Sequence, residues 1–393
     1  MEIKRLKEKF VELYGGDESD LRVFSAAGRV NLIGEHIDYC GGKVFPAALN
    51  LRTVIVARKT GKKVINLTAT TVNDRVTLEI DHLEKYKDLP WGDYQAGVAY
   101  VMQQEGYEIV GCDLLYDTTV PFGSGLSSSA SIEVATAMAF STFSKEAGVK
   151  DVDLVQLAVL SQRSENTYNG VNCGIMDQFA SSLGKKDRAI LLDCATLDYK
   201  YVPLELGDYE MVIANCNKKR SLQDSKYNER RGEVEEALAL LKTRLPGKKN
   251  LAEFSVEEFD ANCDVLKGKG KLYERAKHVV YECDRVNKSV KALEEGKILE
   301  FGELLNQSHY SLRDLYEVTG KELDALTKYS RAFDGCIGSR MTGAGFGGCT
   351  ISLVKKDKVA DFIKTVNAQY AEEIGYEATF YLTSVEDGAR ELK

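Results

Sequence analysis

The segment Gly28–Tyr39 holds the side chains of this sequence that are best suited to chemistry. Arg29, Glu35, His36 and Asp38 bring a guanidinium, two carboxylates and an imidazole into one short stretch. Burying charges is costly unless they are paired or bind a ligand, so this density indicates a site. Carboxylates suit a ligand with several hydroxyl groups, because each carboxylate accepts two hydrogen bonds at fixed angles. A buried structural histidine remains an alternative interpretation of His36.

A second segment, Val120–Ala130, has the composition of a loop that binds phosphate. Gly123 and Gly125 would let backbone N–H groups approach an anion, and the serines and the following helix would add hydrogen bonds and partial positive charge. The loop is not a Walker A loop, because no Gly-Lys-Ser/Thr follows, and it is not a Rossmann fingerprint. A serine N-cap after a glycine turn would explain the same residues without any ligand.

The glycine cluster Gly343–Gly348 does match the pattern Gly-x-Gly-x-x-Gly. A dinucleotide fingerprint leads from a strand into a helix, whereas this cluster leads into the strand-like segment Cys349–Val354. The protein-kinase tripeptides His-Arg-Asp and Asp-Phe-Gly do not occur in the sequence. The cluster is therefore either a structural turn or a backbone surface that packs against a ligand.

The elements that must position these residues are strands and helices in alternation. Strand-like runs include Leu21–Phe24 and Glu210–Asn215, and helical patterns cover Ile132–Phe143 and Asp153–Glu165. Residues 228–333 are mostly charged helical sequence. The fold class is therefore mixed α and β.

Length and charge limit the architecture and the partners. A chain of 393 residues is too long for one ordinary core and predicts two domains with a cleft between them, divided near residues 195–210. The net charge of −8 argues against binding to nucleic acid or to an anionic membrane. No apolar run is long enough for a membrane span.

The cysteines and the first residues indicate the compartment. Nine cysteines form an odd count without a Cys-x-x-Cys pair, which favours reduced thiols over disulfides or a zinc site. Met1–Phe10 has the pattern of an amphipathic helix and lacks the apolar core of a signal peptide. We therefore expect a cytoplasmic protein.

The segments Gly28–Pro46, Val120–Ala130 and Arg340–Gly348 together resemble the three motifs of galactokinases, which are members of the GHMP class of small-molecule kinases. The resemblance implies an α+β, two-domain GHMP kinase fold with the active site in the interdomain cleft. Residues 1–200 would form the N-terminal domain, and residues 201–393 a ferredoxin-like C-terminal domain. The implied reaction transfers the γ-phosphoryl group of ATP to the 1-hydroxyl of α-D-galactose, and the implied assembly is a monomer whose partners are these small molecules.

The resemblance also assigns the catalytic and metal-binding residues. Asn172–Gln178 matches the motif that carries the catalytic acid, so Asp177 is the candidate base or hydroxyl-orienting group, and Arg29 matches the catalytic arginine. Ser129 and Glu165 match the pair that holds Mg²⁺. Without the resemblance, Asp177 would be interpreted as a helix cap and Glu165 as a solvated residue at a helix end.

The ligand-contacting residues follow from the same resemblance. The sugar-binding set comprises Glu35, His36, Asp38, Gly174 and Tyr227, and the nucleotide-phosphate set comprises Gly123, Ser124, Gly125, Leu126, Ser127, Ser128 and Ser129. Within the sugar-binding set, Asp38 is expected at the 3- and 4-hydroxyls, and Glu35 and His36 toward C6.

Two other functions and two further features remain open. The chain could be a GHMP kinase for another sugar, or a regulator that binds ATP and galactose without turnover. The basic stretch Asn215–Arg231, with Lys219 and Arg220 inside it, could be a solvated helix face or could face the nucleotide. Trp91, the only tryptophan, could stack near the adenine, but we expect it to fill the core.

Overall fold

The computed structural model describes residues 2–148, 153–218 and 223–392. Its largest sheet has six strands in the order β13-β1-β3-β6-β4-β5. The strands are β1 (Arg22–Asn31), β3 (Pro46–Lys59), β4 (Val64–Ala69), β5 (Val72–Glu79), β6 (Cys112–Thr118) and β13 (Arg390–Leu392). Neighbouring strands run antiparallel, except β4 and β6, which are parallel.

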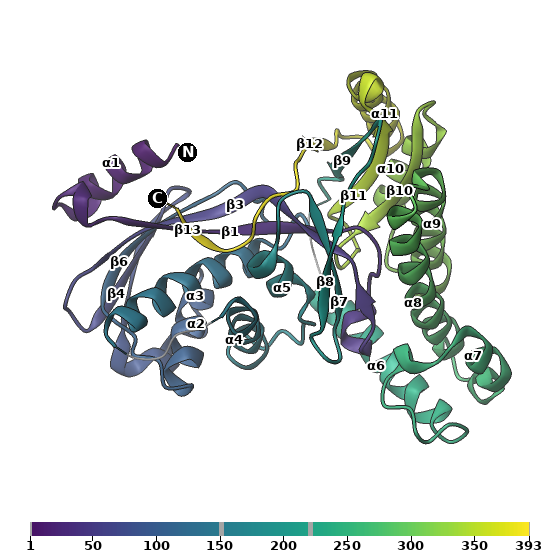
Figure 1. The fold of residues 1–393 in the computed structure, drawn as a ribbon, viewed down its shortest axis with the longest axis horizontal. Helices are drawn as coiled ribbons and strands as arrows, with labels where there is room; N and C mark the ends of the chain where they lie inside the picture. The colour runs from purple at the N-terminus through teal and green to yellow at the C-terminus, as the bar shows by residue number, and fades with distance from the viewer. Residues whose placement is uncertain (1, 149–152, 219–222, 393) are drawn as a thin grey trace.

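Helices cover both faces of this sheet unequally (Figure 1). One face carries α2 (Asp93–Gln104), α3 (Ser128–Glu146), α4 (Leu154–Thr167) and α5 (Met176–Leu183), and the other carries α1 (Ile3–Tyr14). Every residue of β1 after the first is buried. A side chain on this strand is therefore held by packing from both sides of the sheet.

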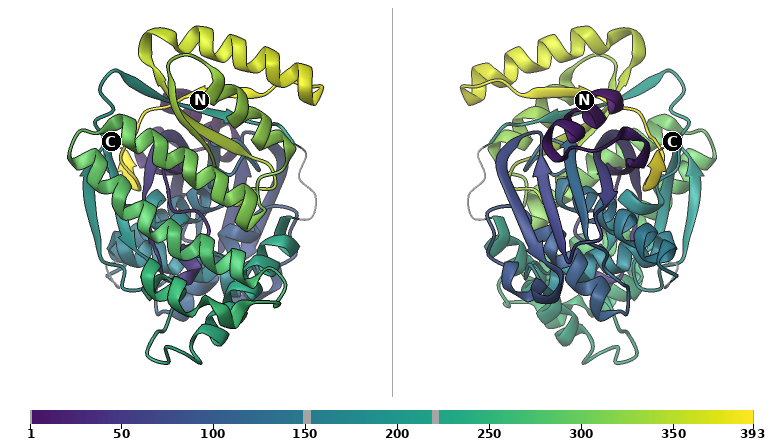
Figure 2. Two further views of the ribbon diagram at one scale, coloured as in Figure 1. Left: turned by 90° about the vertical axis from the view of Figure 1, so that its right-hand side faces the viewer. Right: turned by 90° about the vertical axis from the view of Figure 1, so that its left-hand side faces the viewer.

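The second half of the chain builds a four-stranded antiparallel sheet in the order β10-β11-β9-β12. Its strands are β9 (Tyr209–Asn215), β10 (Cys336–Thr342), β11 (Cys349–Lys355) and β12 (Thr379–Leu382). Its helices are α6 (Gln223–Leu241), α7 (Val256–Asn262), α8 (Leu272–Glu294), α9 (Ile298–Ser311), α10 (Lys321–Ala332) and α11 (Val359–Ile374). Helices α9 and α10 pack on β10, and α8 packs on α9, so the left view of Figure 2 looks onto these long helices.

A small third sheet and the last strand connect the two halves. The sheet consists of β2 (Lys43–Val44), β7 (Arg188–Asp193) and β8 (Tyr199–Pro203). After β12, the chain crosses back to the large sheet, where β13 pairs antiparallel with β1 (Figure 1). A division near residue 200 remains a prediction, and the last strand lies in the sheet of the first half. Within the described ranges, every helix is too short or too polar to span a bilayer.

The mixed fold is confirmed, but the first strand is longer than predicted. The sequence pattern ended it at Phe24, whereas β1 continues to Asn31 and includes Arg29. Small residues with weak strand propensity hide this continuation, and pairing with β3 overrides that propensity. Gly28 has a packing reason, because a Cβ there would lie 2.8 Å from the carbonyl oxygen of Leu126. The Val120–Ala130 loop therefore packs directly on the strand that carries Arg29.

Candidate active site

The centre of the site is an ion pair between Arg29 and Asp177. Arg29 Nε and Nη2 donate to Asp177 Oδ1 and Oδ2 at 2.9 and 2.8 Å. Asp177 stands in the first turn of α5, where the partial positive charge of the helix N-terminus favours a carboxylate. The Arg29 side chain is 4% exposed and the Asp177 side chain 31%. The guanidinium is thus fixed by the protein, while the carboxylate stays accessible.

The Val120–Ala130 loop closes over this pair. Arg29 Nη1 donates to the carbonyl oxygen of Gly125 at 2.5 Å, and Ser127 Oγ donates to Asp177 Oδ2 at 2.6 Å. Ser127 is the N-cap residue of α3 at a φ of 61°, but its side chain makes no capping hydrogen bond. The serine N-cap interpretation does not hold for Ser127, because its hydroxyl is committed to a charged acceptor.

Two cavities meet at the ion pair. The first has a volume of about 410 Å³ and the second about 340 Å³, and Arg29, Asp177 and Ala344 line both. A ligand in one cavity would therefore face a ligand in the other across the Arg29–Asp177 pair.

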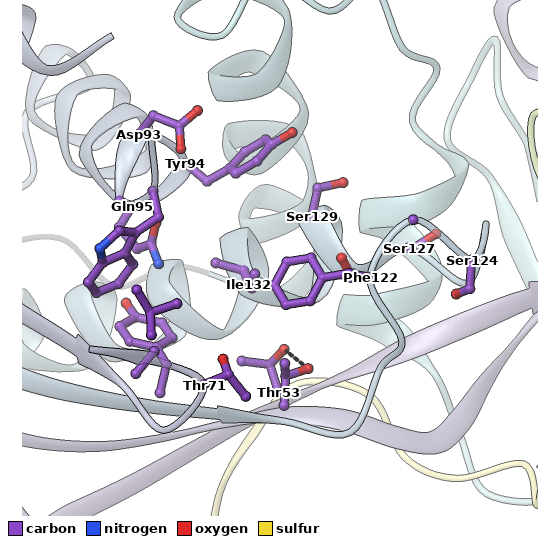
Figure 3. A pocket seen from close by; sticks show the side chains of 18 of the residues that line it. Thr53, Thr71, Asp93, Tyr94, Gln95, Phe122, Ser124, Ser127, Ser129 and Ile132 are labelled. Atoms are coloured by element: carbon purple, nitrogen blue, oxygen red, sulfur yellow. Dashed lines mark hydrogen bonds between the residues drawn. The ribbon is translucent and has the colours of Figure 1, made fainter. Parts of the chain in front are cut away.

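The first cavity combines a polar loop with an apolar wall (Figure 3). The predicted phosphate-binding residues that line it are Gly123, Ser124, Gly125, Ser127, Ser128 and Ser129. Leu126 does not line it, because its side chain is fully buried in the core. The remaining wall includes Thr71, Trp91, Tyr94, Phe122 and Ile132. Such a cavity suits a ligand with an anionic end and a flat apolar end.

Trp91 contributes to this wall and to the core at once. Its side chain packs against the hydrophobic cluster under the large sheet and also lines the first cavity. Its buried Nε1 has no hydrogen-bond partner within the described part of the chain. From the sequence we expected Trp91 to fill the core. The structure shows that it packs on the core and also lines the first cavity.

The second cavity contains the whole predicted sugar-binding set: Glu35, His36, Asp38, Gly174 and Tyr227. Burial, together with the nearby Asp177 carboxylate, raises the pKa of Asp38 to about 7. The backbone of Gly174 lies so close to this group that a Cβ there would meet Asp38 Oδ2 at 1.8 Å. Glycine is therefore required at residue 174 for Asp38 to keep its position.

Glu35 is engaged by the protein on both oxygens. Its Oε1 accepts the N–H of Gly343 at 2.7 Å, and its Oε2 accepts from Asn31 Nδ2 at 2.9 Å. Arg340 Nη2 lies 3.4 Å from Oε1, in a pair whose side chains are almost fully buried. Glu35 thus ties the third glycine cluster to the first motif at the edge of the second cavity.

His36 is a neutral, hydrogen-bonded wall of the same cavity. Its Nε2 lies 3.1 Å from the carbonyl oxygen of Ala344 and its Nδ1 2.9 Å from the Tyr39 hydroxyl. Because a carbonyl only accepts, Nε2 carries the proton and Tyr39 donates to Nδ1, while Tyr39 accepts from Tyr316 at 2.8 Å. Burial lowers the pKa of His36 to about 3. The Tyr227 ring packs 5.6 Å from the imidazole.

The proposed metal ligands lie beside the first cavity. Ser129 lines it, whereas Glu165 lines neither cavity and is only 7% exposed. The Ser129 side chain acts to lower the pKa of Glu165, but burial and the neighbouring Asp177 charge prevail and raise it to about 7. This donor set fits Mg²⁺, because it offers a few hard oxygens and carries negative charge that no cation of the protein neutralises through a described ion pair.

The comparisons with known proteins agree along the whole chain. The galactokinase galactose-binding signature matches residues 8–59, the GHMP kinase N-terminal domain residues 93–185 and the GHMP kinase C-terminal domain residues 289–372. A galactokinase of Clostridium tetani is 47% identical over 393 residues, which cover 100% of this chain and 98% of that protein. The chain belongs to the galactokinase family.

Solved structures confirm the fold of a galactokinase. Lactococcus lactis galactokinase complexed with galactose superposes with a TM-score of 0.94 at 44% identity, over 100% of both chains. Methanococcus jannaschii mevalonate kinase superposes with a TM-score of 0.67 at 18% identity, covering 93% of this chain and 98% of that one, and at this identity it supports the fold alone.

The basic stretch of this galactokinase family member is largely used inside the protein. Lys218 pairs with Glu322 at 3.0 Å, Arg230 Nε donates to the Tyr316 carbonyl oxygen, and Arg231 donates to that of Asn172. Lys219 and Arg220 lie outside the described residues. Arg230 and Arg231 therefore hold α6 against neighbouring segments, whereas Lys218 pairs outside this helix.

Sequence reasoning missed several polar residues around the galactokinase site. Tyr39 and Arg340 fall inside matched motifs, but no charge pattern singles them out. Glu133 lies in α3, where spacing alone marks it only as a helical residue, and Gln178, the last residue of the Asn172–Gln178 motif, lies in α5 without an assigned role. A charged or amide residue on an otherwise buried helix face would have indicated them. The sequence does not show which face of each helix is buried, so this indication appears only in the structure.

Proposed function

We propose that Arg29 and Asp177 are the catalytic pair of the galactokinase reaction in this chain. Family membership gives the chain this activity, in which ATP phosphorylates the 1-hydroxyl of α-D-galactose. The observation that carries the proposal is the bidentate Arg29–Asp177 pair at the junction of two cavities. We assign the nucleotide to the first cavity and the sugar to the second.

Asp177 would hold the hydroxyl that attacks the γ-phosphoryl group. Its carboxylate lies 2.6 Å from Ser127 Oγ and is accessible at the junction. Arg29 pairs with the carboxylate at two points and places positive charge where negative charge develops on the transferring group. Since three donors from Arg29 and Ser127 already hold Asp177, its position costs no reorganisation during the reaction.

The phosphate-binding loop and the metal pair would hold ATP. Backbone N–H groups of the loop and the N-terminus of α3 suit the phosphates. Ser129 and Glu165 would hold Mg²⁺, which when bound neutralises charge on the phosphate oxygens. The apolar wall with Trp91 would receive the base.

Sugar selection would depend mainly on Asp38. Its half-buried carboxyl group lines the second cavity beside Gly174 and can bond two neighbouring hydroxyls. An epimer that misplaces one hydroxyl would leave this carboxyl group unpaired beneath the bound sugar, which costs about 1–3 kcal/mol. Glu35 and His36 would shape the C6 end, and Tyr227 would close the cavity.

The test of the catalytic pair is Asp177→Asn, with Asp81→Asn as a matched control on an exposed carboxylate. We expect kcat to fall by about 10²- to 10⁴-fold in the Asp177 variant, as for loss of a general base. Galactose binding by calorimetry should persist, and the control should match the wild type. Near-normal turnover of the Asp177 variant would remove this residue from the proposed role.

ADP release across a panel of sugars tests the substrate. We expect galactose to be preferred, and comparable turnover of N-acetylgalactosamine or arabinose would contradict the assignment. We also propose a monomer in the cytoplasm, which light scattering and cell fractionation test.

A further inference from the structure

Behind the Arg29–Asp177 pair, the side-chain amide of Gln178 bridges two carboxyl groups. Gln178 Nε2 donates to Glu133 Oε2 at 3.0 Å and to Glu165 Oε2 at 2.6 Å. Gln178 and Glu133 are fully buried, and Glu165 is 7% exposed. The three residues come from α5, α3 and α4, so the bridge joins three helices at a point next to the site.

The orientation of the amide follows from its neighbours. Its nitrogen has two hydrogens, and each carboxyl oxygen here accepts one of them. The flipped amide would place Gln178 Oε1 against Glu165 Oε2 and would remove the 2.6 Å hydrogen bond to that oxygen. Gln178 Oε1 and Glu133 Oε1 are both buried and have no hydrogen-bond partner within the described part of the chain. Each such atom costs about 1–3 kcal/mol, and an apolar core would avoid this cost.

The charges around Glu133 are carboxylates. Glu165, Asp177 and Asp93 all act on it, and burial together with Glu165 raises its pKa well above the ordinary value. Burial and Glu165 thus oppose ionisation of Glu133, whose Oε2 accepts the Gln178 hydrogen beside Glu165.

We propose that Gln178, anchored by Glu133, is a positioning residue that holds one oxygen of Glu165 and so fixes this carboxyl group beside Ser129. This inference rests on the proposed role of Glu165 toward Mg²⁺. A fixed carboxylate offers a preset ligand direction, and loss of such an outer hydrogen bond typically weakens metal binding about 10- to 100-fold. Cys173 Sγ also reaches Glu165 Oε2, at 3.5 Å, but as a weaker donor.

The test is Gln178→Met, which removes the two N–H donors at similar volume. Gln307→Met on α9 is the matched control, because Gln307 bonds only exposed Glu303 within the described structure. Calorimetry measures the affinity for ADP with and without Mg²⁺, and velocity is measured against Mg²⁺ concentration. We expect the Mg²⁺-dependent gain in ADP affinity to fall at least about 10-fold and excess Mg²⁺ to restore velocity. ADP affinity without Mg²⁺ and galactose affinity should stay within about twofold.

Unchanged Mg²⁺ dependence in Gln178→Met would overturn the inference. A fall in galactose affinity and in metal-free ADP affinity as large as the fall in the Mg²⁺-dependent gain would also overturn it, because such a fall indicates a purely structural bridge. If Gln178→Met does not fold, Glu133→Met carries the test with the same expected shift, and Glu133→Gln should reduce that shift because its carbonyl oxygen still accepts the hydrogen. Glu165→Gln separates the two proposals. If Glu165→Gln leaves the Mg²⁺ dependence unchanged, the proposed metal role of Glu165 is wrong. If Glu165→Gln changes the Mg²⁺ dependence and Gln178→Met does not, only the proposed role of Gln178 is wrong.

Discussion

A methyl group at residue 174 should damage sugar recognition without touching the nucleotide. In Gly174→Ala the new Cβ would lie 1.8 Å from Asp38 Oδ2 and 2.4 Å from Asp38 Cγ. An ordinary contact needs about 3.4 Å, so the carboxyl group must move by roughly 1.5 Å or the loop must shift. Either movement breaks a hydrogen bond of about 2.8 Å to a sugar hydroxyl.

The expected loss follows from that hydrogen bond. A bond to a charged or strongly polarised group contributes about 1.5–3 kcal/mol, which corresponds to roughly a 10- to 150-fold fall in kcat/KM for galactose. The affinity for ATP should change less than about twofold, because neither Gly174 nor Asp38 lines the first cavity. Steady-state kinetics with coupled ADP detection measures both values.

A control variant and a double mutant test whether the effect of Gly174→Ala acts through Asp38. Gly232→Ala is the matched control, because a Cβ on that helical glycine meets nothing within 4 Å and should be neutral or stabilising. If Gly174→Ala acts through Asp38, its effect should largely vanish in an Asp38→Ala background, since the two changes share one mechanism. A folded Gly174→Ala protein with wild-type kcat/KM, or an effect fully additive with Asp38→Ala, would refute the reasoning.

Three further predictions concern the first cavity and the ion pair. The pKa of Glu165 is raised from 4.5 to about 7, so its ionisation destabilises the fold increasingly as the pH rises between these values. Glu165→Gln should therefore increase the free energy of unfolding by about 3 kcal/mol above pH 7 and change it little below pH 4.5. Urea denaturation without Mg²⁺ would measure this difference. Arg29→Lys cannot form the two-point contact with Asp177, so kcat should fall about 100-fold or more, and a change below threefold in stopped assays would argue against the transition-state role. Adding ADP should change the fluorescence of Trp91, the only tryptophan, whereas galactose alone should leave it nearly constant, and the opposite pattern in a titration would exchange the two cavities.

The sequence predicted the mixed fold and the proximity of Arg29, Asp177 and the phosphate-binding loop. It could do so because these residues lie in long glycine-containing segments whose order and content resemble one family. It misplaced the end of β1, because small residues such as Ala27 have no strand signal until a partner strand supplies the pairing. The resemblance assigned Leu126 together with the rest of the phosphate-binding loop; this assignment stays a prediction, and the Leu126 side chain lies in the core rather than in the first cavity.

The hydrogen-bond partners of the site residues were the least predictable part of the site. The sequence indicates Glu35 and His36 as candidate sugar contacts, with a structural role also open for His36. The structure engages both oxygens of Glu35 and both ring nitrogens of His36 with protein partners. Their partners, including Gly343 and Tyr39, come from distant or unmarked positions. Such pairings depend on tertiary distances of a few ångströms, which a pattern along one chain does not contain.

The pairing of β13 with β1 makes the first half of this enzyme depend on the far end of its chain. The contact between Arg22 and Glu391 joins residues 369 positions apart, so an edge of the large sheet is completed only by a very long-range loop closure. A fragment that stops near residue 200 would expose that edge of β1, the strand from which Arg29 projects, and an open edge invites aggregation. Producing the amino-terminal half alone would therefore require supplying residues 390–392 as a separate or grafted strand.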